Sequence, residues 1–449
     1  MEKNVLDSSQ LFAVHELETG LCSCSPRSYV NHLLGGQILQ LRAGCEDVEN
    51  NEKNRQIKLV RLFALLALLP LLIFKYYNFL NNSISDGLAA IGLQFSLPGL
   101  NLAVPVGISF FTFQAVGYML DVYHGRIQRE KNFFDYVLFV SFFPQVASGP
   151  ISKASELLPQ IKAVKTFNYE QAVSGLRYLL WGMFLKVALA DRAGIYVDTV
   201  FSEYTKFSGA GCFIGSLLYS VQIYADFAGY SLMAVGIGKT LGFDLINNFK
   251  RPYFSVSITD FWRRWHISLS RWLKDYVYIP LGGSRCSKLR NYWNIFVTFL
   301  VSGIWHGANW TFIVWGILHG VCQIIEKMFG WNKNDYKGFA RFGRIVLTFL
   351  LVTIAWTIFR SPSIGETFEY FSRYLVTTGK LIAEGETLVY IFMALIPVLL
   401  HEFVTEFFPD FYKKMISNTV IRWISYITVF TLLMLIGVFD GSSFIYVNF

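Results

Sequence analysis

Long apolar runs constrain the fold of this chain more than any other feature of its sequence. The run Leu59–Leu80 reads LVRLFALLALLPLLIFKYYNFL and exceeds the roughly 18 apolar residues that a membrane-crossing helix needs. Similar runs recur toward the C-terminus, and only 16% of the residues are charged, whereas soluble domains are typically near about 25%. Because the runs are continuous rather than alternating, they predict an all-α polytopic membrane protein and not a β-barrel.

The apolar runs predict about nine to eleven membrane segments in total. The clearest spans are expected at Leu59–Leu80, Leu102–Leu120, Ala172–Ala190, Phe213–Leu241, Ile345–Phe359, Leu388–His401 and Val420–Phe439. The apolar segment Phe133–Pro150 ends in Pro and Gly, which indicates a short re-entrant element. The amphipathic stretches Ile151–Gln171 and Thr367–Leu381 are typical of interfacial helices.

The chain carries a net charge of +8, and its Lys and Arg residues cluster in short loops between the spans. This is the positive-inside pattern of a membrane protein, so the basic charge does not indicate nucleic-acid binding. The six cysteines are scattered without a paired Cys-x-x-Cys motif, so we expect neither a disulfide framework nor a metal site.

Residues 1–56 differ from the rest because they are polar and contain no apolar run of spanning length. They are either a disordered cytosolic tail or an altered start of the chain. We therefore divide the chain into an atypical segment, 1–56, and a transmembrane domain, 57–449.

The stretch Arg251–Gly320 carries the chemistry-bearing residues. Its first half is basic and aromatic, with the sequence RPYFSVSITDFWRRWHISLSRWLKDYVYIPLGGSR. Asp260–Val277 is predicted to be one helix, with Ser257 as its N-cap. Helical spacing then places His266 on a Trp-flanked face beside a face of guanidinium groups. Such a helix is either an interfacial anchor or part of a binding site.

The second half of the stretch is an apolar segment broken in its middle by SGIWHGANW, which contains His306. The loops before and after it are both basic. If both are cytosolic, the chain from Tyr292 to Ile325 turns back within the membrane, and His306 lies deep at that turn. A broken backbone at such depth must be buried by protein or line a cavity. His319 and His401, each on an apolar run, are more simply explained as structural residues.

A deep histidine suits proton abstraction at neutral pH because its ordinary pKa is near 6.5. His306 could take the proton of a hydroxyl that attacks an activated carbonyl, and Asn309 or nearby backbone N–H groups could stabilise the oxyanion. Asp226 lies in another apolar stretch, YADFAGYSLMAVGIGKTLGF. It is either a helix-to-helix hydrogen-bond partner or part of a polar cavity. The small residues around it predict close helix packing in lipid.

The motifs DFWRRWHISLSRWLKDYVYIPLGGSR and VSGIWHGANWTFIVWGILHG closely resemble those of the membrane-bound O-acyltransferase (MBOAT) family. They look most like the bacterial branch that contains the alginate O-acetylation membrane protein and the teichoic-acid D-alanyl transfer protein. SFFPQVASGPI and DFAGYSLMAVG also resemble this branch. The resemblance covers the chain from about residue 57 onward, and it departs at Leu232, where the branch often has an acidic residue.

The resemblance implies helices around a central channel or funnel and acyl transfer from an activated donor to a hydroxyl. It makes His306 the family's invariant histidine and His266 the second histidine of the branch. The expected substrate-binding residues are Trp262, Arg263, Arg264, Arg271, Lys274, Trp305, Asn309 and Asp226. The Arg and Lys side chains among them are expected to contact the phosphates of the acyl donor. No bound cofactor is expected; the donor would be acetyl-CoA or an acyl-carrier thioester.

The expected function is therefore O-acetylation of an exported cell-surface polysaccharide by a multi-pass protein of the cell membrane. An extracytoplasmic esterase-like protein is an expected partner. D-alanyl or other acyl transfer to a teichoic-acid-like polymer, and transport without chemistry, remain alternatives.

Overall fold

A computed structural model describes residues 50–95, 97–100, 105, 107–146, 149–333 and 335–439, with side chains from residue 58 onward except 61. The prediction of a disordered or altered segment falls mostly on residues 1–49, which lie outside the described residues. The first described residue, Asn50, belongs to helix α3. It lies seven residues before the predicted start of the transmembrane domain.

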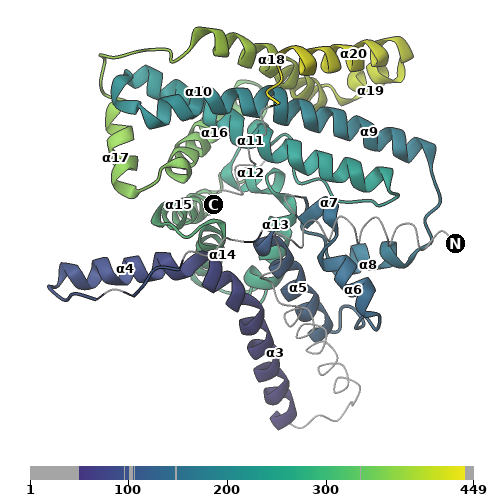
Figure 1. The fold of residues 1–449 in the computed structure, drawn as a ribbon, viewed down its shortest axis with the longest axis vertical. Coiled ribbons are helices and arrows are strands. Elements are labelled where there is room, and N and C mark those ends of the chain that lie inside the picture. The colour runs from purple at the N-terminus through teal and green to yellow at the C-terminus, as the bar shows by residue number, and fades with distance from the viewer. Residues whose placement is uncertain are drawn as a thin grey trace. The chain divides into compact units, whose positions relative to one another are not determined.

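Every named element of the described chain is helical (Figure 1). The α-helices are α3 (Asn50–Leu71), α4 (Tyr77–Ala90), α5 (Ile108–Tyr123), α6 (Phe133–Val140), α7 (Phe143–Val146), α8 (Ala154–Lys162), α9 (Tyr169–Met183), α10 (Asp191–Ser202), α11 (Gly209–Thr240), α12 (Ile258–Arg264), α13 (Ile267–Leu273), α14 (Lys288–His306), α15 (Trp310–Met328), α16 (Gly338–Arg360), α17 (Ile364–Arg373), α18 (Gly385–Phe407), α19 (Pro409–Ser417) and α20 (Thr419–Ile436). Short π or 3₁₀ helices are η1 (Leu72–Tyr76), η2 (Phe184–Ala190), η3 (Tyr204–Lys206), η4 (Pro252–Phe254) and η5 (Lys274–Tyr278).

Within the part of the chain that the structure describes, five helical segments are long and apolar enough to cross a membrane. They are Lys58–Ala90, Tyr169–Ser202, Gly338–Arg360, Gly385–Phe407 and Thr419–Ile436. The predicted all-α, multi-pass membrane fold is confirmed. The segment predicted to be re-entrant forms the short apolar helices α6 and α7, and the two stretches predicted to be interfacial contain the short helices α8 and α17.

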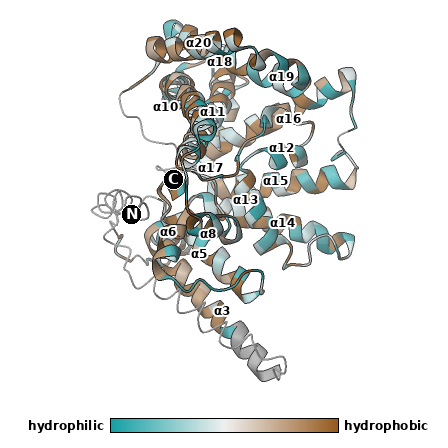
Figure 2. Ribbon diagram, turned by 90° about the vertical axis from the view of Figure 1, so that its right-hand side faces the viewer, coloured by the Kyte–Doolittle hydropathy of each residue, from teal (hydrophilic) through white to brown (hydrophobic). Residues whose placement is uncertain are grey.

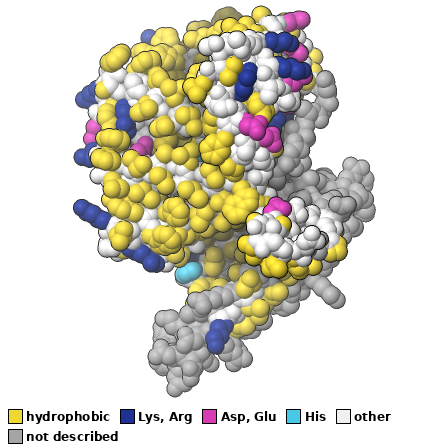
Figure 3. Space-filling model, turned by 90° about the vertical axis from the view of Figure 1, so that its left-hand side faces the viewer, with side chains coloured by type: hydrophobic (Ala, Val, Ile, Leu, Met, Phe, Trp, Pro, Cys, Tyr) yellow, Lys and Arg dark blue, Asp and Glu magenta, His cyan; other side chains and the backbone are white. Residues whose placement is uncertain are grey.

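Lipid contact is the physical reason why many large apolar side chains lie on the surface. Along α20 the exposed residues include Trp423, Ile427 and Phe430. Figure 2 shows α20 mainly in the hydrophobic colour, whereas the short α19 is largely hydrophilic. Figure 3 shows a wide hydrophobic face with Lys, Arg, Asp and Glu gathered mostly toward its margins. A soluble protein rarely exposes so large an apolar patch.

The described chain forms two compact units. The first comprises residues up to Asn168 together with Leu241–Leu245. Inside it, the rings of Tyr118 and Tyr136 lie 4.9 Å apart, and the Glu130 carboxylate pairs with Lys162 at 2.5 Å. These contacts join α5, α6 and α8 into one body.

The second unit comprises Tyr169–Thr240 and the residues from Ile246 onward, and it holds both histidines of interest. Its central pair is α9 against α11. A Cβ added to Gly229 would lie 2.8 Å from the carbonyl oxygen of Gly182, and one added to Gly236 would lie 2.7 Å from that of Gly175. The small residues of α11 therefore permit the close helix packing that the sequence predicted.

Candidate active site

His306 lies at the turn of a helical hairpin in the second unit. α14 ends at His306 and α15 begins at Trp310, so the predicted break in this apolar segment is confirmed. The two helices pack tightly because a Cβ at Gly303 would collide with the carbonyl of Phe312. The side-chain oxygen of Asn309 accepts a hydrogen bond from the Thr311 backbone N–H at 3.1 Å and caps α15.

Aromatic rings surround the His306 side chain, of which 3% is exposed. Its ring centroid lies 4.9 Å from that of Trp315, 5.0 Å from Trp305 and 5.5 Å from Phe359. Three large rings from α14, α15 and α16 thus fix the orientation of the imidazole and separate it from bulk water.

His266 interrupts the helix that the sequence predicts as continuous over Asp260–Val277, and that prediction is wrong. α12 ends at Arg264 and α13 begins at Ile267, with His266 between them at φ 43°, ψ 55°. The left-handed region costs an L-residue about 1–2 kcal/mol. Asn248 stabilises the bend, because its carbonyl accepts from Ile267 N–H at 3.0 Å and its side-chain oxygen from Ser268 N–H at 3.2 Å.

The predicted start of this helix is correct, since the Ser257 hydroxyl accepts from the Asp260 N–H at 3.0 Å. The start of the helix was predictable because the capping residues lie close together in the sequence. The kink could not, because it depends on pairing with Asn248, a residue of a different segment. Backbone strain of this kind is often retained at functional sites.

The imidazole of His266 is fully buried, and neither ring nitrogen has a hydrogen-bond partner among the described residues. The ring of Phe227 packs against it edge-on at 4.6 Å. Burial lowers the pKa of His266 to about 3, so the ring is neutral at physiological pH. Buried polar atoms are normally hydrogen-bonded, and a buried imidazole with two unused nitrogens is therefore a candidate for ligand contact.

The indole of Trp305 brings the two histidines together. Its ring centroid lies 6.1 Å from His266 and 5.0 Å from His306. The two imidazoles can therefore be no further apart than the sum of these distances. His266 and His306, forty positions apart in sequence, therefore share one aromatic wall, the indole of Trp305. Helical phasing alone did not predict this proximity.

Trp262 and His319 form a hydrogen-bonded pair beside this wall. The Trp262 indole N–H donates to Nδ1 of His319 at 3.2 Å. Trp315 contacts both His319 and His306, with a centroid distance of 4.9 Å to each. His319, interpreted from the sequence as structural, thus supports the rings that surround His306.

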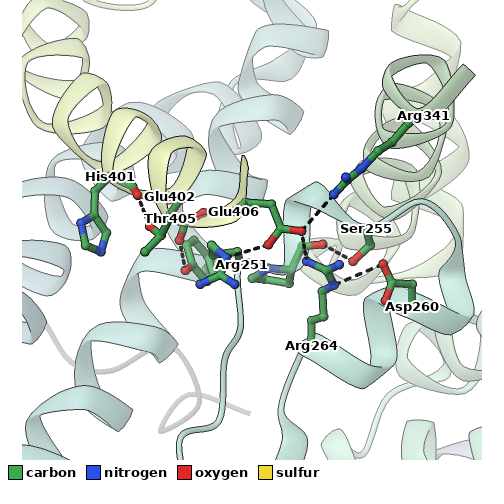
Figure 4. A network of polar contacts seen from close by, with 11 residues as sticks. Arg251, Ser255, Asp260, Arg264, Arg341, His401, Glu402, Thr405 and Glu406 are labelled. Atoms are coloured by element: carbon green, nitrogen blue, oxygen red, sulfur yellow. Dashed lines mark hydrogen bonds and ion pairs between the residues drawn. The ribbon is translucent and has the colours of Figure 1, made fainter. Parts of the chain in front are cut away.

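A cluster of opposite charges joins α12, α16 and α18 (Figure 4). The carboxylate of Glu406 contacts Arg251 at 2.7 Å, Arg264 at 3.0 Å and Arg341 at 3.2 Å. Arg264 also pairs with Asp260 at 3.2 Å. Arg264, predicted to bind donor phosphates, is therefore already engaged by two carboxylates.

The other predicted substrate contacts differ in their surroundings. Arg263 and Lys274 are exposed, and Arg271 is half-buried. The Asn309 amide makes two hydrogen bonds at the turn, since its nitrogen donates to the Pro362 carbonyl at 2.7 Å and its oxygen caps α15. Asn309 therefore acts in holding the hairpin turn.

Asp226 forms part of a buried ionic triad. Lys186 in η2 contacts Asp226 at 2.7 Å and Asp191 at 2.6 Å, and all three side chains are less than one-tenth exposed. Of the two interpretations left open for Asp226, the geometry favours a contact between helices. The Lys186–Asp191 contact completes this triad within the second unit.

The sequence did not identify Glu406 or Arg341, nor Glu402, whose carboxylate accepts a hydrogen bond from the Tyr224 hydroxyl. The signal was present, since Glu402 and Glu406 lie one helical turn apart at the end of apolar α18, where unpaired carboxylates would be costly. Among the described residues, no group of three or more His, Cys, Asp or Glu side chains is arranged to hold a metal ion.

Comparison with known proteins adds to this geometry. The model of the membrane-bound O-acyltransferase family matches residues 126–361, which is more than half of the chain. The chain belongs to this family. Within the MBOAT match lie α6 to α16, including the kink at His266 and the hairpin turn at His306.

Individual proteins with related names are also similar to this chain. The protein named "Probable alginate O-acetylase AlgI" from Pseudomonas syringae pv. tomato is 43% identical over 292 residues, 65% of this chain and 55% of that protein. The peptidoglycan O-acetyltransferase of Helicobacter pylori is 39% identical over 292 residues, 59% of this chain and 55% of that protein. The teichoic acid D-alanyltransferase of Bacillus subtilis is 30% identical over 281 residues, 58% of this chain and 70% of that protein. The chain thus spans about half the length of the curated O-acetylating relatives that it matches.

Proposed function

We propose that this MBOAT protein transfers an acetyl group from a thioester donor to hydroxyl groups of an exported cell-surface polysaccharide. The observation that carries the proposal is the shared contact of two buried histidines with Trp305. The relatives whose names describe O-acetylation are 43% and 39% identical to this chain, whereas the D-alanyltransferase is 30% identical. The higher identities support an acetyl group rather than a D-alanyl group.

His306 is the general base in this proposal. Its imidazole takes the proton of the acceptor hydroxyl as the hydroxyl oxygen attacks the thioester carbonyl. The tetrahedral intermediate then collapses, the carbon–sulfur bond breaks, and the same proton passes from His306 to the departing thiolate. The products are an ester and a thiol, so no other reactant is consumed.

His266 acts as a neutral hydrogen-bonding residue beside the reacting atoms. It is buried, and its lowered pKa keeps it uncharged, so its N–H can donate to the thioester carbonyl oxygen without a competing proton equilibrium. The strained backbone at His266 holds the ring in place before the substrate arrives.

The two substrates reach the histidines from opposite ends of α16. Arg341, in the cluster with Glu406, and Arg360, at the last residue of α16, are separated by roughly 28 Å along the helix axis. That distance is close to the roughly 30 Å of a bilayer core. The basic loops support a cytosolic position for Arg341, and on that side the exposed Arg263 and Lys274 would contact donor phosphates.

The proposal is tested with the full chain in proteoliposomes. Radiolabelled acetyl thioester and D-alanyl thioester are supplied in separate assays with a glycopolymer, and ester-linked label on the polymer is counted. Acetyl ester is expected. D-alanyl ester alone would replace the proposed acyl group by the second candidate, and polymer or lipid flux without any ester would indicate a transporter.

A further inference from the structure

A pocket of about 510 Å³ lies at the end of α16 that is remote from Arg341. This volume is within the range of roughly 300–1,000 Å³ found for small-ligand sites. Its wall comes from α10, η3, α16 and α17, all in the second unit. The polar and aromatic lining residues are Asp198, Thr199, Phe201, Ser202, Tyr204, Arg360 and Glu366.

Two contacts connect this pocket to the turn that contains His306. The ring of Phe359, the residue before Arg360, lies 5.5 Å from the His306 ring. The side-chain amide of Asn309 donates to the carbonyl of Pro362, which also lines the pocket, at 2.7 Å. The pocket wall and the hairpin turn are therefore parts of one packed structure.

The chemistry of the lining fits a hydroxyl-rich ligand. Arg360 pairs with Asp198 at 2.7 Å, and the two side chains are 32% and 64% exposed, so both can still contact a ligand. Ser363 caps α17 and donates to the Glu366 carboxylate at 3.3 Å, which orients that carboxylate. Carboxylates accept from sugar hydroxyls, and a guanidinium donates to sugar oxygens.

Other ligand classes fit the lining less well. A lipid chain would meet charged and hydroxyl groups, which it cannot satisfy. A donor phosphate would meet two carboxylates against one guanidinium that is already paired. A saccharide satisfies the donors and the acceptors together.

We propose that this pocket binds a saccharide segment of the acceptor polymer next to the unit that receives the acyl group. The inference rests on the proposed function for its identification of the acceptor. It assigns Asp198, Arg360 and Glu366 as acceptor-binding residues outside the histidine site. The pocket would hold the polymer so that a neighbouring hydroxyl reaches His306.

The test uses two probes, an uncharged N-acetylglucosamine tetrasaccharide and an alginate tetrasaccharide, titrated onto the full chain in detergent by calorimetry. D198N and E366Q are the variants. E203Q is the matched control, because Glu203 belongs to the same segment but pairs with Lys206 outside the pocket lining. We expect at least one probe to bind, with affinity reduced about tenfold in D198N and E366Q and unchanged in E203Q.

A second readout separates this inference from the proposed function. With the polymer as acceptor, the same two variants should raise KM about tenfold with kcat nearly unchanged, and thioester hydrolysis without acceptor should be unaltered. If neither probe binds, or binding is equal in all variants while acetyl transfer proceeds, the pocket assignment is overturned. If binding follows the expected pattern while no acyl group is transferred, the proposed function fails and the saccharide site stands.

Discussion

The indole N–H of Trp262 donates a hydrogen bond to Nδ1 of His319, 3.2 Å away, and both side chains are buried. Since Trp315 packs between His319 and His306, this hydrogen bond supports the ring that contacts the proposed base. H319L leaves the indole N–H without an acceptor, which should cost about 1–3 kcal/mol of stability. H319N keeps an acceptor near the Nδ1 position and should lose less.

Thermal unfolding of the two variants in detergent measures this difference. The double variant W262F/H319L should be less destabilised than the sum of its single variants, because the lost interaction is shared. Additive effects would show that the hydrogen bond does not contribute.

The close contact between α9 and α11 predicts that G229A lowers stability. Its added Cβ would lie 2.8 Å from the Gly182 carbonyl oxygen, so the helices must separate at a cost of roughly 1–3 kcal/mol. G343A is the matched control in α16, where a Cβ would meet nothing within 4 Å. Improved helix propensity should make G343A neutral or more stable by up to about 1 kcal/mol. Equal melting temperatures for both variants would contradict the packing account.

The buried triad predicts a large effect for K186M. Asp191 and Asp226 would lose the cation that both contact, and leaving a buried charge uncompensated costs about 3–5 kcal/mol. K186M/D226N removes one of the two carboxylates and should recover part of the loss. K206M, at an exposed pair with Glu203, should change stability by less than about 1 kcal/mol. Denaturation in detergent would compare the three variants, and a K186M no worse than K206M would contradict the triad's role.

The lowered pKa of His266 predicts how stability changes with pH. Between its folded pKa of about 3 and its unfolded value near 6.5, the unfolded chain binds a proton that the folded chain does not. His266 should therefore reduce stability by up to about 1.4 kcal/mol for each pH unit below 6.5, and have no effect above about pH 7.5. H266N should remove this part of the acid sensitivity. Parallel stability profiles for wild type and H266N between pH 4 and 7 would contradict it.

Local features of the sequence were sufficient for the membrane fold, for the break at His306 and for the Ser257 cap. The length of an apolar run, a small-residue interruption and a capping spacing are each contained within one segment. The contacts that complete the site were not predictable in this way. The kink at His266 depends on Asn248, and the engagement of Arg264 depends on Glu406, which lies on α18. Contacts between residues that are far apart in the sequence cannot be predicted from the pattern of any one segment.

The central claim is that His306 is the base for acyl transfer, and single-turnover kinetics with the full chain in proteoliposomes test it most directly. The amount of acetyl ester formed on the polymer is followed for wild type, H306A and H124A. His124 is an exposed histidine at the end of α5 and serves as the control for the substitution itself. The account predicts that H306A inserts and melts like wild type but transfers at least about 100-fold more slowly, since general bases contribute about 10²–10⁴-fold. Transfer by a folded H306A at the wild-type rate would contradict it.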